Sequence, residues 1–213
     1  MDKMEILRHV DHTILTQTCT WEQVQKICDE GLRFFTASVC IPPSYVRRAS
    51  SYLQGRLPVC TVIGFPNGYQ TAAVKVFEVK DAVANGADEV DMVVNLGDVK
   101  DGNFAAVECE IRDLKRAAGD KILKVIIETC FLTQEEKIEL CRVVEASGAD
   151  FIKTSTGFGS AGAVLEDIQL FREKLPARVK IKAAGGIRSF EAAEEFIKAG
   201  AEPLGTSSLI KLL

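Results

Sequence analysis

Short strand-like runs alternate with amphipathic stretches along the whole of this 213-residue chain. Several of the runs are continuously apolar, as expected for strands of a parallel sheet that is covered on both faces. No Pro/Ser-rich linker or low-complexity segment interrupts the alternation, so we expect a single domain spanning residues 1–213. The strand candidates are Val10–Ile14, Phe34–Cys40, Val59–Ile63, Glu89–Val94, Leu123–Glu128, Phe151–Thr154, Lys180–Lys182 and Leu204–Thr206.

The helical stretches between these runs have recognisable ends. Thr20 can cap a helix that continues through Glu30 and stops at Gly31. Thr133 followed by Glu136 forms a capping-box pattern, and the helix it begins is expected to end near Gly148. Ser189 likewise begins a helix that covers Ala192–Lys198 and stops at Gly200.

The order of these elements predicts the fold class. Three helix ends repeat one pattern, Gly86-Ala87-Asp88, Gly148-Ala149-Asp150 and Gly200-Ala201-Glu202, which is ordinary chemistry for a helix-to-strand loop. About eight such units suit an α/β protein of the closed (β/α)₈ TIM barrel type, near the lower end of its usual size. An open doubly wound sheet is the alternative, but we favour closure because no obvious edge strand is present.

Composition excludes several classes of function. The content is 47% hydrophobic and 26% charged, with a net charge of -4 and interspersed signs, so there is no basic stripe for nucleic acid. No apolar run approaches membrane-spanning length, and the N-terminus does not resemble a secretory signal or a transit peptide. We therefore expect a cytoplasmic protein that acts on a small molecule.

Metal and disulfide chemistry are also poorly supported by the sequence. The seven cysteines are scattered and lack metal-type pairing, so we expect reduced thiols. His9 and His12 flank Asp11, but two histidines without a third ligand make a poor zinc site. The sequence predicts no metal.

Two lysines fall where strand-like runs give way to glycine-containing turns. Lys153 follows Phe151-Ile152, and Lys182 lies on the next strand, with Lys180 pointing the same way. A neighbouring ammonium group disfavours protonation of a lysine and leaves more free amine for nucleophilic attack, as imine chemistry requires. Spacing alone does not decide which of the two is the nucleophile.

Other polar residues also fall near the predicted strand ends. Asp91 can move the protons that imine and enamine steps require, although it could equally be a plain counter-ion for a lysine. Asp11, Cys40 and Thr154 are expected to lie at the same rim near the substrate, while a cysteine on a buried strand is more often inert core. The alternative for the whole group is a buried ion-pair network with a purely structural role.

Three glycine- or serine-containing turns are candidate phosphate sites. The segment Gly157–Gly162 has the spacing G-x-G-x-x-G of a dinucleotide fingerprint, but the following strand ends in Lys182 where that fingerprint needs an acidic residue. Gly185-Gly186 and Gly205–Ser208 fall after the last two strands, where barrels often bind phosphate. The three turns together predict a phosphorylated substrate.

These segments resemble the deoxyribose-phosphate aldolase family, which are class I aldolases with a (β/α)₈ barrel. The resemblance spans nearly the whole chain, and its most specific part is Ile-Lys-Thr-Ser-Thr-Gly-Phe at residues 152–158. It rests on Ala37–Cys40, Val62–Pro66, Gly86–Asn95, Lys124–Thr129, Phe151–Gly162, Lys180–Arg188 and Gly205–Ser208.

The resemblance implies reversible cleavage of 2-deoxy-D-ribose 5-phosphate to D-glyceraldehyde 3-phosphate and acetaldehyde, without a metal or organic cofactor. It also implies a role in deoxyribonucleotide catabolism. By position it places the Schiff-base lysine at Lys153, the second active-site lysine at Lys182 and the proton-relay aspartate at Asp91. It places the phosphate contacts at Gly157, Gly185, Gly186, Ser207 and Ser208.

The sequence departs from the family pattern in its last strand and at its end. Glu202-Pro203 stands where Asp-Arg is usual, and proline cannot donate a ladder hydrogen bond, so this strand is expected to begin late. Ala183 replaces the more usual proline after Lys182, which should matter little. The chain also lacks the tyrosine-ended tail that some members use in proton transfer, so water would take that role.

Two other functions stay open on the sequence alone. One is a phosphate-binding barrel isomerase or synthase that forms no imine, and the other is a noncatalytic sugar-phosphate sensor. In each case we expect a homodimer or a higher homo-oligomer, as barrels of this kind often form.

Overall fold

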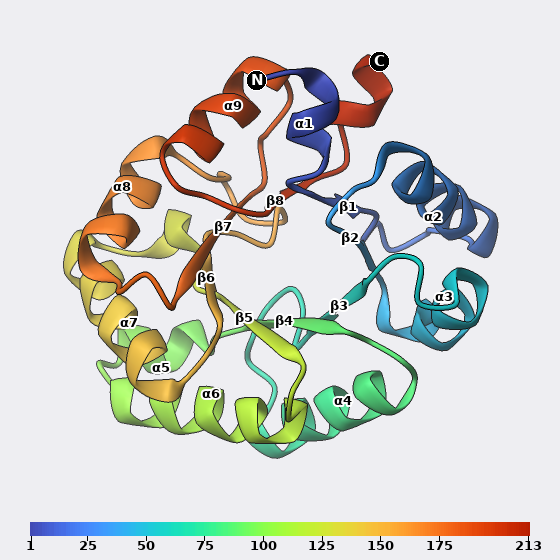
Figure 1. Cartoon of the computed structure of the whole chain (residues 1–213). Coiled ribbons are helices and arrows are strands. Elements are labelled where there is room, and N and C mark those ends of the chain that lie inside the picture. Colours follow the sequence, from blue (N-terminus) through green and yellow to red (C-terminus); the bar gives the residue numbers. More distant parts are fainter.

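The computed structural model describes residues 1–213 and contains a closed barrel of parallel strands in the order β1-β2-β3-β4-β5-β6-β7-β8 (Figure 1). Pairing of β1 with β8 completes the ring. The (β/α)₈ barrel expected from the alternating pattern is therefore confirmed, and the open-sheet alternative is wrong. The strands are β1 (Val10–Thr13), β2 (Ser38–Ile41), β3 (Val59–Ile63), β4 (Glu89–Val93), β5 (Ile122–Ile126), β6 (Phe151–Lys153), β7 (Lys180–Ala184) and β8 (Leu204–Thr206).

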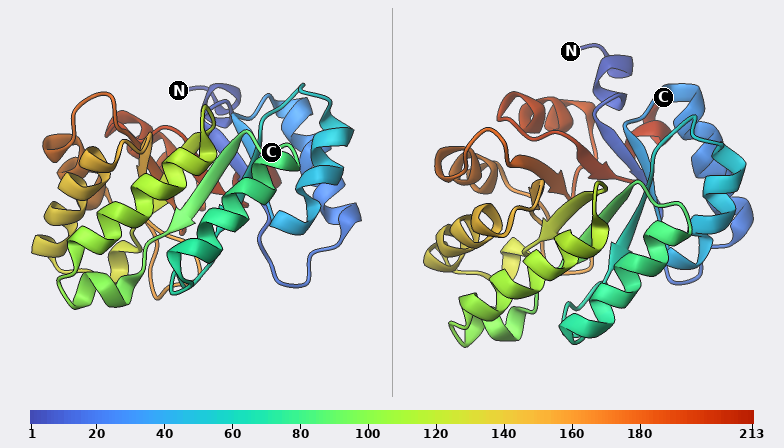
Figure 2. Two further views of the ribbon diagram at one scale, coloured as in Figure 1. Left: turned by 90° about the horizontal axis from the view of Figure 1, so that it is seen from below. Right: turned by 60° about the horizontal axis from the view of Figure 1, so that its bottom comes forward.

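Helices surround the ring of strands, and both views in Figure 2 show them packed along its outer side. They are α1 (Lys3–Leu7), α2 (Trp21–Phe34), α3 (Val46–Leu53), α4 (Ala72–Ala84), α5 (Leu96–Lys100), α6 (Phe104–Ala118), α7 (Gln134–Ser147), α8 (Leu165–Lys174) and α9 (Phe190–Lys198). Short 3₁₀ turns lie at Pro43–Tyr45, Thr129–Phe131 and Leu209–Leu212. None of the helices is long and apolar enough to cross a membrane.

The predicted helix starts are confirmed by their caps. The side chains of Thr20 and Thr133 each accept a hydrogen bond from the backbone N–H three residues later. The side chains of Gln23 and Glu136 in turn accept from the backbone N–H of Thr20 and Thr133, which completes a capping box at both helices. Ser189 caps α9 through the N–H of Ala192, at 3.1 Å. Pro203 immediately precedes β8, so that strand begins at Leu204 as expected.

The largest error in the predicted strand boundaries concerns the second strand. Phe34 ends α2 and Phe35 follows it in the left-handed conformation, with φ 55°, so the second strand begins only at Ser38. Gly31 does not stop this helix. It lies inside the helix, at a place where an added Cβ would be 2.5 Å from Leu57 Cδ2. Because glycine has no Cβ, the helix can pack closely against Leu57 there. The fifth strand also ends two residues earlier than expected, at Ile126.

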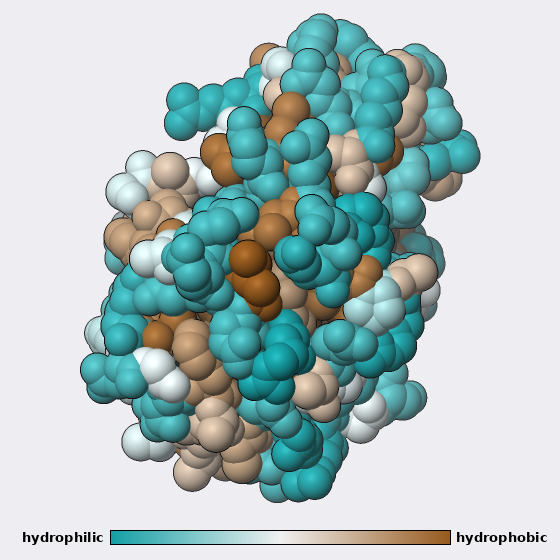
Figure 3. All heavy atoms as spheres, turned by 90° about the vertical axis from the view of Figure 1, so that its left-hand side faces the viewer, coloured by the Kyte–Doolittle hydropathy of each residue, from teal (hydrophilic) through white to brown (hydrophobic).

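The apolar core lies between the strands and the helices, and Val39, Val90 and Ile152 are fully buried in it. Their outward direction leaves the alternate positions of each strand facing the barrel interior. On the outer surface, Figure 3 shows mostly hydrophilic side chains over the side of the molecule covered by α7 and α8, with separate hydrophobic patches between them. Some of the polar residues that remain buried lie inside the barrel, among them Asp91 and Lys124, whereas Lys75 and Glu110 pair between α4 and α6.

Candidate active site

Charged side chains occupy the interior of the barrel, which in proteins of this fold is mostly filled by branched apolar side chains. They are Asp11, Glu89, Asp91, Lys124, Lys153 and Lys182, supplied by β1, β4, β5, β6 and β7. Asp11, Asp91 and Lys182 have no appreciable exposure, and Lys153 is 3% exposed. Burial of this many charges is costly unless they pair, and each of them does.

Asp91 lies at the centre of the cluster. Its Oδ2 accepts hydrogen bonds from Lys153 Nζ at 2.6 Å and from Lys182 Nζ at 2.8 Å. Strand register explains how the two lysines meet, because Lys153 of β6 and Lys182 of β7 are directly paired. The expected adjacency of Lys153, Lys182 and Asp91 is confirmed as geometry, although Asp91 is the middle residue of β4 and not at its end.

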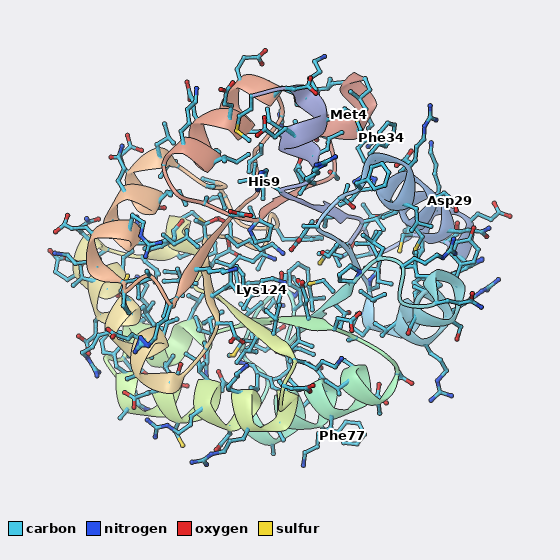
Figure 4. The ribbon with its side chains drawn as sticks, viewed as in Figure 1. Met4, His9, Asp29, Phe34, Phe77 and Lys124 are labelled. Carbon is cyan, nitrogen blue, oxygen red and sulfur yellow. The ribbon has the colours of Figure 1, made fainter.

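Lys124 is a member of the cluster that the sequence analysis overlooked. It lies within the ring of strands (Figure 4), donates to Asp91 Oδ1 at 2.9 Å and also contacts Glu89. Register pairs it directly with Asp91 on the neighbouring strand. The signal available in the sequence was a single lysine within the apolar run Leu123–Ile127. Such a position is buried on both faces of a parallel sheet, so a charge there needs a partner.

Asp11 belongs to the same cluster but lies early in its strand. It contacts Lys182, and its Oδ2 lies 3.6 Å from Lys124 Nζ. Its other oxygen, Oδ1, is buried and has no hydrogen-bond partner within the protein. This oxygen is a free acceptor beside the lysines.

Mutual attraction keeps the cluster ionised. Burial opposes the charge of Asp91, but Lys124, Lys153 and Lys182 outweigh it and hold the pKa of this carboxyl well below its usual range. Burial likewise opposes the charge of Lys182, whereas Asp11 and Asp91 outweigh it and raise the pKa of that ammonium. The pKa of Lys124 is raised in the same manner, chiefly by Asp91 against the effect of burial. Asp91 and Lys182 therefore stay charged at neutral pH.

Two cysteines adjoin the carboxylate. Cys40 and Cys60 are directly paired on β2 and β3 and are both buried, and the Cys60 thiol donates to Asp91 Oδ1 at 3.1 Å. A hydrogen bond from Cys60 lowers the pKa of the Cys40 thiol, while burial raises the pKa of Cys60 well above its usual range. Cys40 is thus an interior residue close to Asp91 and does not lie at the rim.

Several of these groups could in principle offer ligands to a metal. Ligand atoms of Cys40, Cys60 and Asp91 lie within 4.8 Å of one another, and so do those of Asp11, Cys60 and Glu89. However, the carboxylates in both groups already accept hydrogen bonds from lysines. The positive charge of those lysines opposes a divalent cation at either place.

A cavity of about 650 Å³ opens beside the last strands. Among its lining residues are Gly157, Gly185, Gly186, Ser207 and Ser208, so the structure brings together all five predicted phosphate contacts. The backbone N–H groups of Gly157, Gly185, Gly186 and Ser207 donate no hydrogen bond within the protein. Free N–H groups that gather around one cavity favour an anion, and Arg188 and Lys211 in the lining add positive charge.

Close packing of two turns explains the glycine spacing of residues 157–162. An added Cβ at Gly162 would lie 2.3 Å from the carbonyl carbon of Gly185, so the turn after β6 lies directly on the turn after β7. The helix α8 begins only at Leu165, and Val164 before it makes no side-chain cap. The G-x-G-x-x-G pattern therefore serves loop packing here, and the structure gives the dinucleotide interpretation no support.

Another residue expected at the rim has a different position. Thr154 is fully buried, and its hydroxyl donates to the carbonyl of Ala184 at 3.2 Å and accepts from the N–H of Ala184 at 3.1 Å. It therefore ties β6 to β7 and does not line the cavity.

Comparison with known proteins identifies the family that this chain resembles. Residues 6–209 match the family model described as DeoC/LacD family aldolase. A deoxyribose-phosphate aldolase of Clostridioides difficile (strain 630) is 61% identical over 98% of this chain and 95% of its own length. One from Streptococcus agalactiae serotype Ia is 59% identical over 100% of this chain and 96% of its own length.

A solved structure extends the likeness to the fold. The tetrameric deoxyribose phosphate aldolase of Aeropyrum pernix is 28% identical, with a TM-score of 0.92, and the alignment covers 99% of this chain and 90% of that chain. Both the sequence match and the structural match span almost the whole barrel, including the interior lysines and the turns after β6, β7 and β8. The chain therefore belongs to the DeoC/LacD family of aldolases.

Proposed function

We propose that this aldolase reversibly cleaves 2-deoxy-D-ribose 5-phosphate to D-glyceraldehyde 3-phosphate and acetaldehyde through an imine on Lys153. The observation that carries the proposal is the shared contact of Lys153 and Lys182 with one oxygen of Asp91. These three residues do not line the cavity with the free backbone N–H groups, but Gly205, which does line it, lies against Lys182, because an added Cβ there would be 3.3 Å from Lys182 Cε. Relatives about 60% identical over the full chain bear the name deoxyribose-phosphate aldolase, which supports this choice of substrate.

Lys153 is the nucleophile in this scheme. It is the last residue of β6, and it has one carboxylate contact, whereas Lys182 contacts both Asp11 and Asp91. The free amine of Lys153 attacks the aldehyde carbon C1 of the sugar. Loss of water then gives a protonated imine.

The imine draws electrons from the C2–C3 bond. As the C3 hydroxyl loses its proton, the C2–C3 bond breaks, C3 becomes the aldehyde of glyceraldehyde 3-phosphate, and the two remaining carbons form an enamine on Lys153. The enamine takes a proton at C2, and water hydrolyses the resulting imine to acetaldehyde and free Lys153. Each step moves one proton, so a relay close to Lys153 is needed.

Asp91 and Lys182 provide that relay. Asp91 contacts both lysines, so a proton released near one reaches the other through the carboxylate. Because its pKa is held below the usual range, the Asp91 carboxyl is ionised at rest, so it can act as a proton acceptor and not as a resting acid. The free Oδ1 of Asp11 is an acceptor for a substrate hydroxyl in the same place.

The phosphate occupies the cavity beside β7 and β8. Free N–H groups of Gly157, Gly185, Gly186 and Ser207, together with the hydroxyls of Ser207 and Ser208, offer hydrogen bonds to its oxygens. The sequence predicts that Cys40 and Thr154 lie near the substrate. Both are buried, and the Thr154 hydroxyl is already hydrogen-bonded to Ala184, so a supporting role is favoured for both.

A trapping experiment tests the assignment of Lys153. Borohydride reduction in the presence of acetaldehyde, followed by peptide mass mapping, should place an ethyl group on Lys153 and nowhere else. A coupled assay for glyceraldehyde 3-phosphate should show product with the wild type and none with Lys153→Ala. An adduct on another lysine would contradict the assignment of Lys153, and activity that is insensitive to borohydride would favour an isomerase or synthase without an imine. Binding without product would favour a sugar-phosphate sensor.

The protein is further proposed to be a cytoplasmic homodimer or higher homo-oligomer that takes part in deoxyribonucleotide catabolism. The tetrameric relative from Aeropyrum pernix supports self-association. Phe77 on α4 points away from the barrel (Figure 4) and is 71% exposed, which is unusual for a phenylalanine. Light scattering coupled to size-exclusion chromatography tests the oligomeric state, and a single mass of one chain would contradict it.

A further inference from the structure

Glu128 is a buried carboxylate outside the cluster of interior lysines. It follows β5 and is 3% exposed, and it makes no ion pair with a lysine, arginine or histidine. Its backbone has φ 53°, a left-handed conformation that is uncommon for a residue other than glycine. A buried charge in a strained backbone position is expensive, so a specific set of contacts must compensate for it.

All of its side-chain hydrogen bonds come from one residue. The backbone N–H of Thr156 donates to Oε1 at 3.1 Å and to Oε2 at 3.3 Å, and the hydroxyl of Thr156 also donates to Oε2. Because that hydroxyl proton is used by Glu128, the oxygen of Thr156 is free to accept from the N–H of Phe158, at 3.0 Å. The Glu128 carboxylate thus fixes the Thr156–Phe158 turn through both the backbone N–H and the side-chain hydroxyl of Thr156.

Packing restrains the far end of the same turn. An added Cβ at Gly159 would lie 3.2 Å from Glu128 Cδ and 2.9 Å from Cys130 Sγ, so the turn lies directly against Glu128. The N–H of Thr129, next to Glu128, donates to the carbonyl of Thr154 at 2.9 Å. The segment that follows Lys153 is therefore held to the end of β5 at several points around Glu128.

This turn lines the cavity in which the phosphate is proposed to bind. Thr156, Gly157 and Phe158 all contribute to its wall, and the Gly157 N–H is one of the free donors there. Gly157 has φ 85°, which glycine adopts at little cost. Because glycine adopts many other conformations as easily, it does not by itself fix the direction of its N–H. The neighbouring Thr156 supplies the restraint through its bonds to Glu128.

We infer that Glu128 is a positioning residue for phosphate recognition: it orients the Thr156–Phe158 turn so that the Gly157 N–H is presented to the phosphate of the substrate. The inference rests on the proposed function. A carboxylate suits the task because Thr156 supplies two donors, and a carboxylate offers acceptors only. A glutamine in its place would set an amide N–H₂ against one of those donors.

The test compares phosphorylated and unphosphorylated substrates. For Glu128→Gln, we expect KM for 2-deoxyribose 5-phosphate to rise by about tenfold or more, as one lost charge-assisted hydrogen bond predicts, with kcat changed by less than about threefold. kcat/KM for 2-deoxyribose, which lacks the phosphate, should stay within about twofold of wild type. Loss of a residue that merely supports the fold would lower kcat/KM for both sugars alike, and that result would overturn the inference.

Thr156 supplies matched variants should Glu128→Gln fail to fold. Thr156→Val removes the hydroxyl and should reproduce the substrate-selective rise in KM, whereas Thr156→Ser keeps it and should behave like wild type. The double variant Glu128→Gln/Thr156→Val should be little worse than either single variant, because the two residues act through one contact. Fully additive losses would contradict that coupling and overturn the inference.

Borohydride trapping with acetaldehyde separates this inference from the proposed function. Acetaldehyde carries no phosphate, so wild type and Glu128→Gln should trap it on Lys153 to the same extent. Failure of the wild type to be trapped counts against the imine mechanism. Normal trapping with no selectivity between the two sugars counts against the role of Glu128 alone.

Discussion

Lys153 and Lys182 donate to the same atom, Oδ2 of Asp91, at 2.6 and 2.8 Å. Two ammonium groups on one oxygen repel each other, and their shared acceptor holds them together despite this repulsion. The two lysines are nevertheless unequal, because Lys182 has a second carboxylate partner in Asp11. Lys182 is therefore fixed by two carboxylates and Lys153 by one.

Lys182→Met should therefore lower kcat by about a hundredfold or more, because the Lys153 amine would lose its positive neighbour and the relay its second member. Steady-state kinetics of aldol cleavage measure the effect. Lys180→Met is the matched control, since Lys180 lies on the same strand but is exposed, and it should retain near wild-type activity. Comparable losses in the two variants would show that the charge of Lys182 is not the cause.

Asp91→Asn should lower the free energy of unfolding by about 3–5 kcal/mol at neutral pH, because buried lysines would lose their central partner. The native pKa of Asp91 lies below its ordinary value of 3.8, so its stabilising contribution is fully present above that pH and is lost as the pH falls through the native pKa. The difference between wild type and variant should accordingly shrink in acid. Urea unfolding at several pH values measures it, and a difference that stays constant from neutral pH to about pH 3 would contradict the assignment.

Gly162→Ala should separate the turns after β6 and β7, because the new Cβ would lie 2.3 Å from the carbonyl group of Gly185. Overpacking of this kind costs about 1–3 kcal/mol, and the displaced turns should raise KM for the phosphorylated sugar. Thermal unfolding and steady-state kinetics measure the two effects. Ser160→Ala, an exposed position in the same turn, serves as the control and should change neither quantity.

Lys75 and Glu110 form a buried ion pair between α4 and α6, in which Lys75 Nζ lies 2.9 Å from the carboxylate and also donates to the carbonyl of Val93 at 2.9 Å. Burial lowers the pKa of Lys75 and raises that of Glu110. Lys75→Met should cost about 3–5 kcal/mol of stability because Glu110 would be left buried without its partner. The double variant Lys75→Met/Glu110→Leu should recover part of that loss. A double variant that is less stable than Lys75→Met would show that the unpaired Glu110 is not the cause of the loss.

The order of the strands along the chain was enough to predict which lysines are neighbours in the site. Lys153 and Lys182 were expected to be neighbours because they end consecutive parallel strands, and the register pairs them directly. The contact between Asp91 and Lys153 is different in kind, because β5 separates their strands. Those two residues meet only across the interior of a closed barrel, and that distance cannot be obtained from spacing along the chain.

Lys124 and Phe35 show why the remainder was missed. A single lysine between apolar neighbours has the same pattern whether it faces solvent or an interior carboxylate, and the difference is made by Asp91 on the next strand. Phe34 and Phe35 have strong strand propensity, yet the helix continues because Gly31 allows it to pack closely against Leu57. In both cases a tertiary contact decided the outcome over local preference.

The charges inside the barrel also bear on the order of events in the proposed reaction. Lys124, Lys153 and Lys182 face Asp11, Glu89 and Asp91, so the formal positive and negative charges of these groups are balanced when all are ionised. Release of the proton from Lys153 leaves an excess of one negative charge, and a protonated imine on the same nitrogen restores the balance. The resting protein and the covalent intermediate therefore have the same charge inside the barrel. Only the state with a neutral Lys153 amine, before the aldehyde binds, is unbalanced.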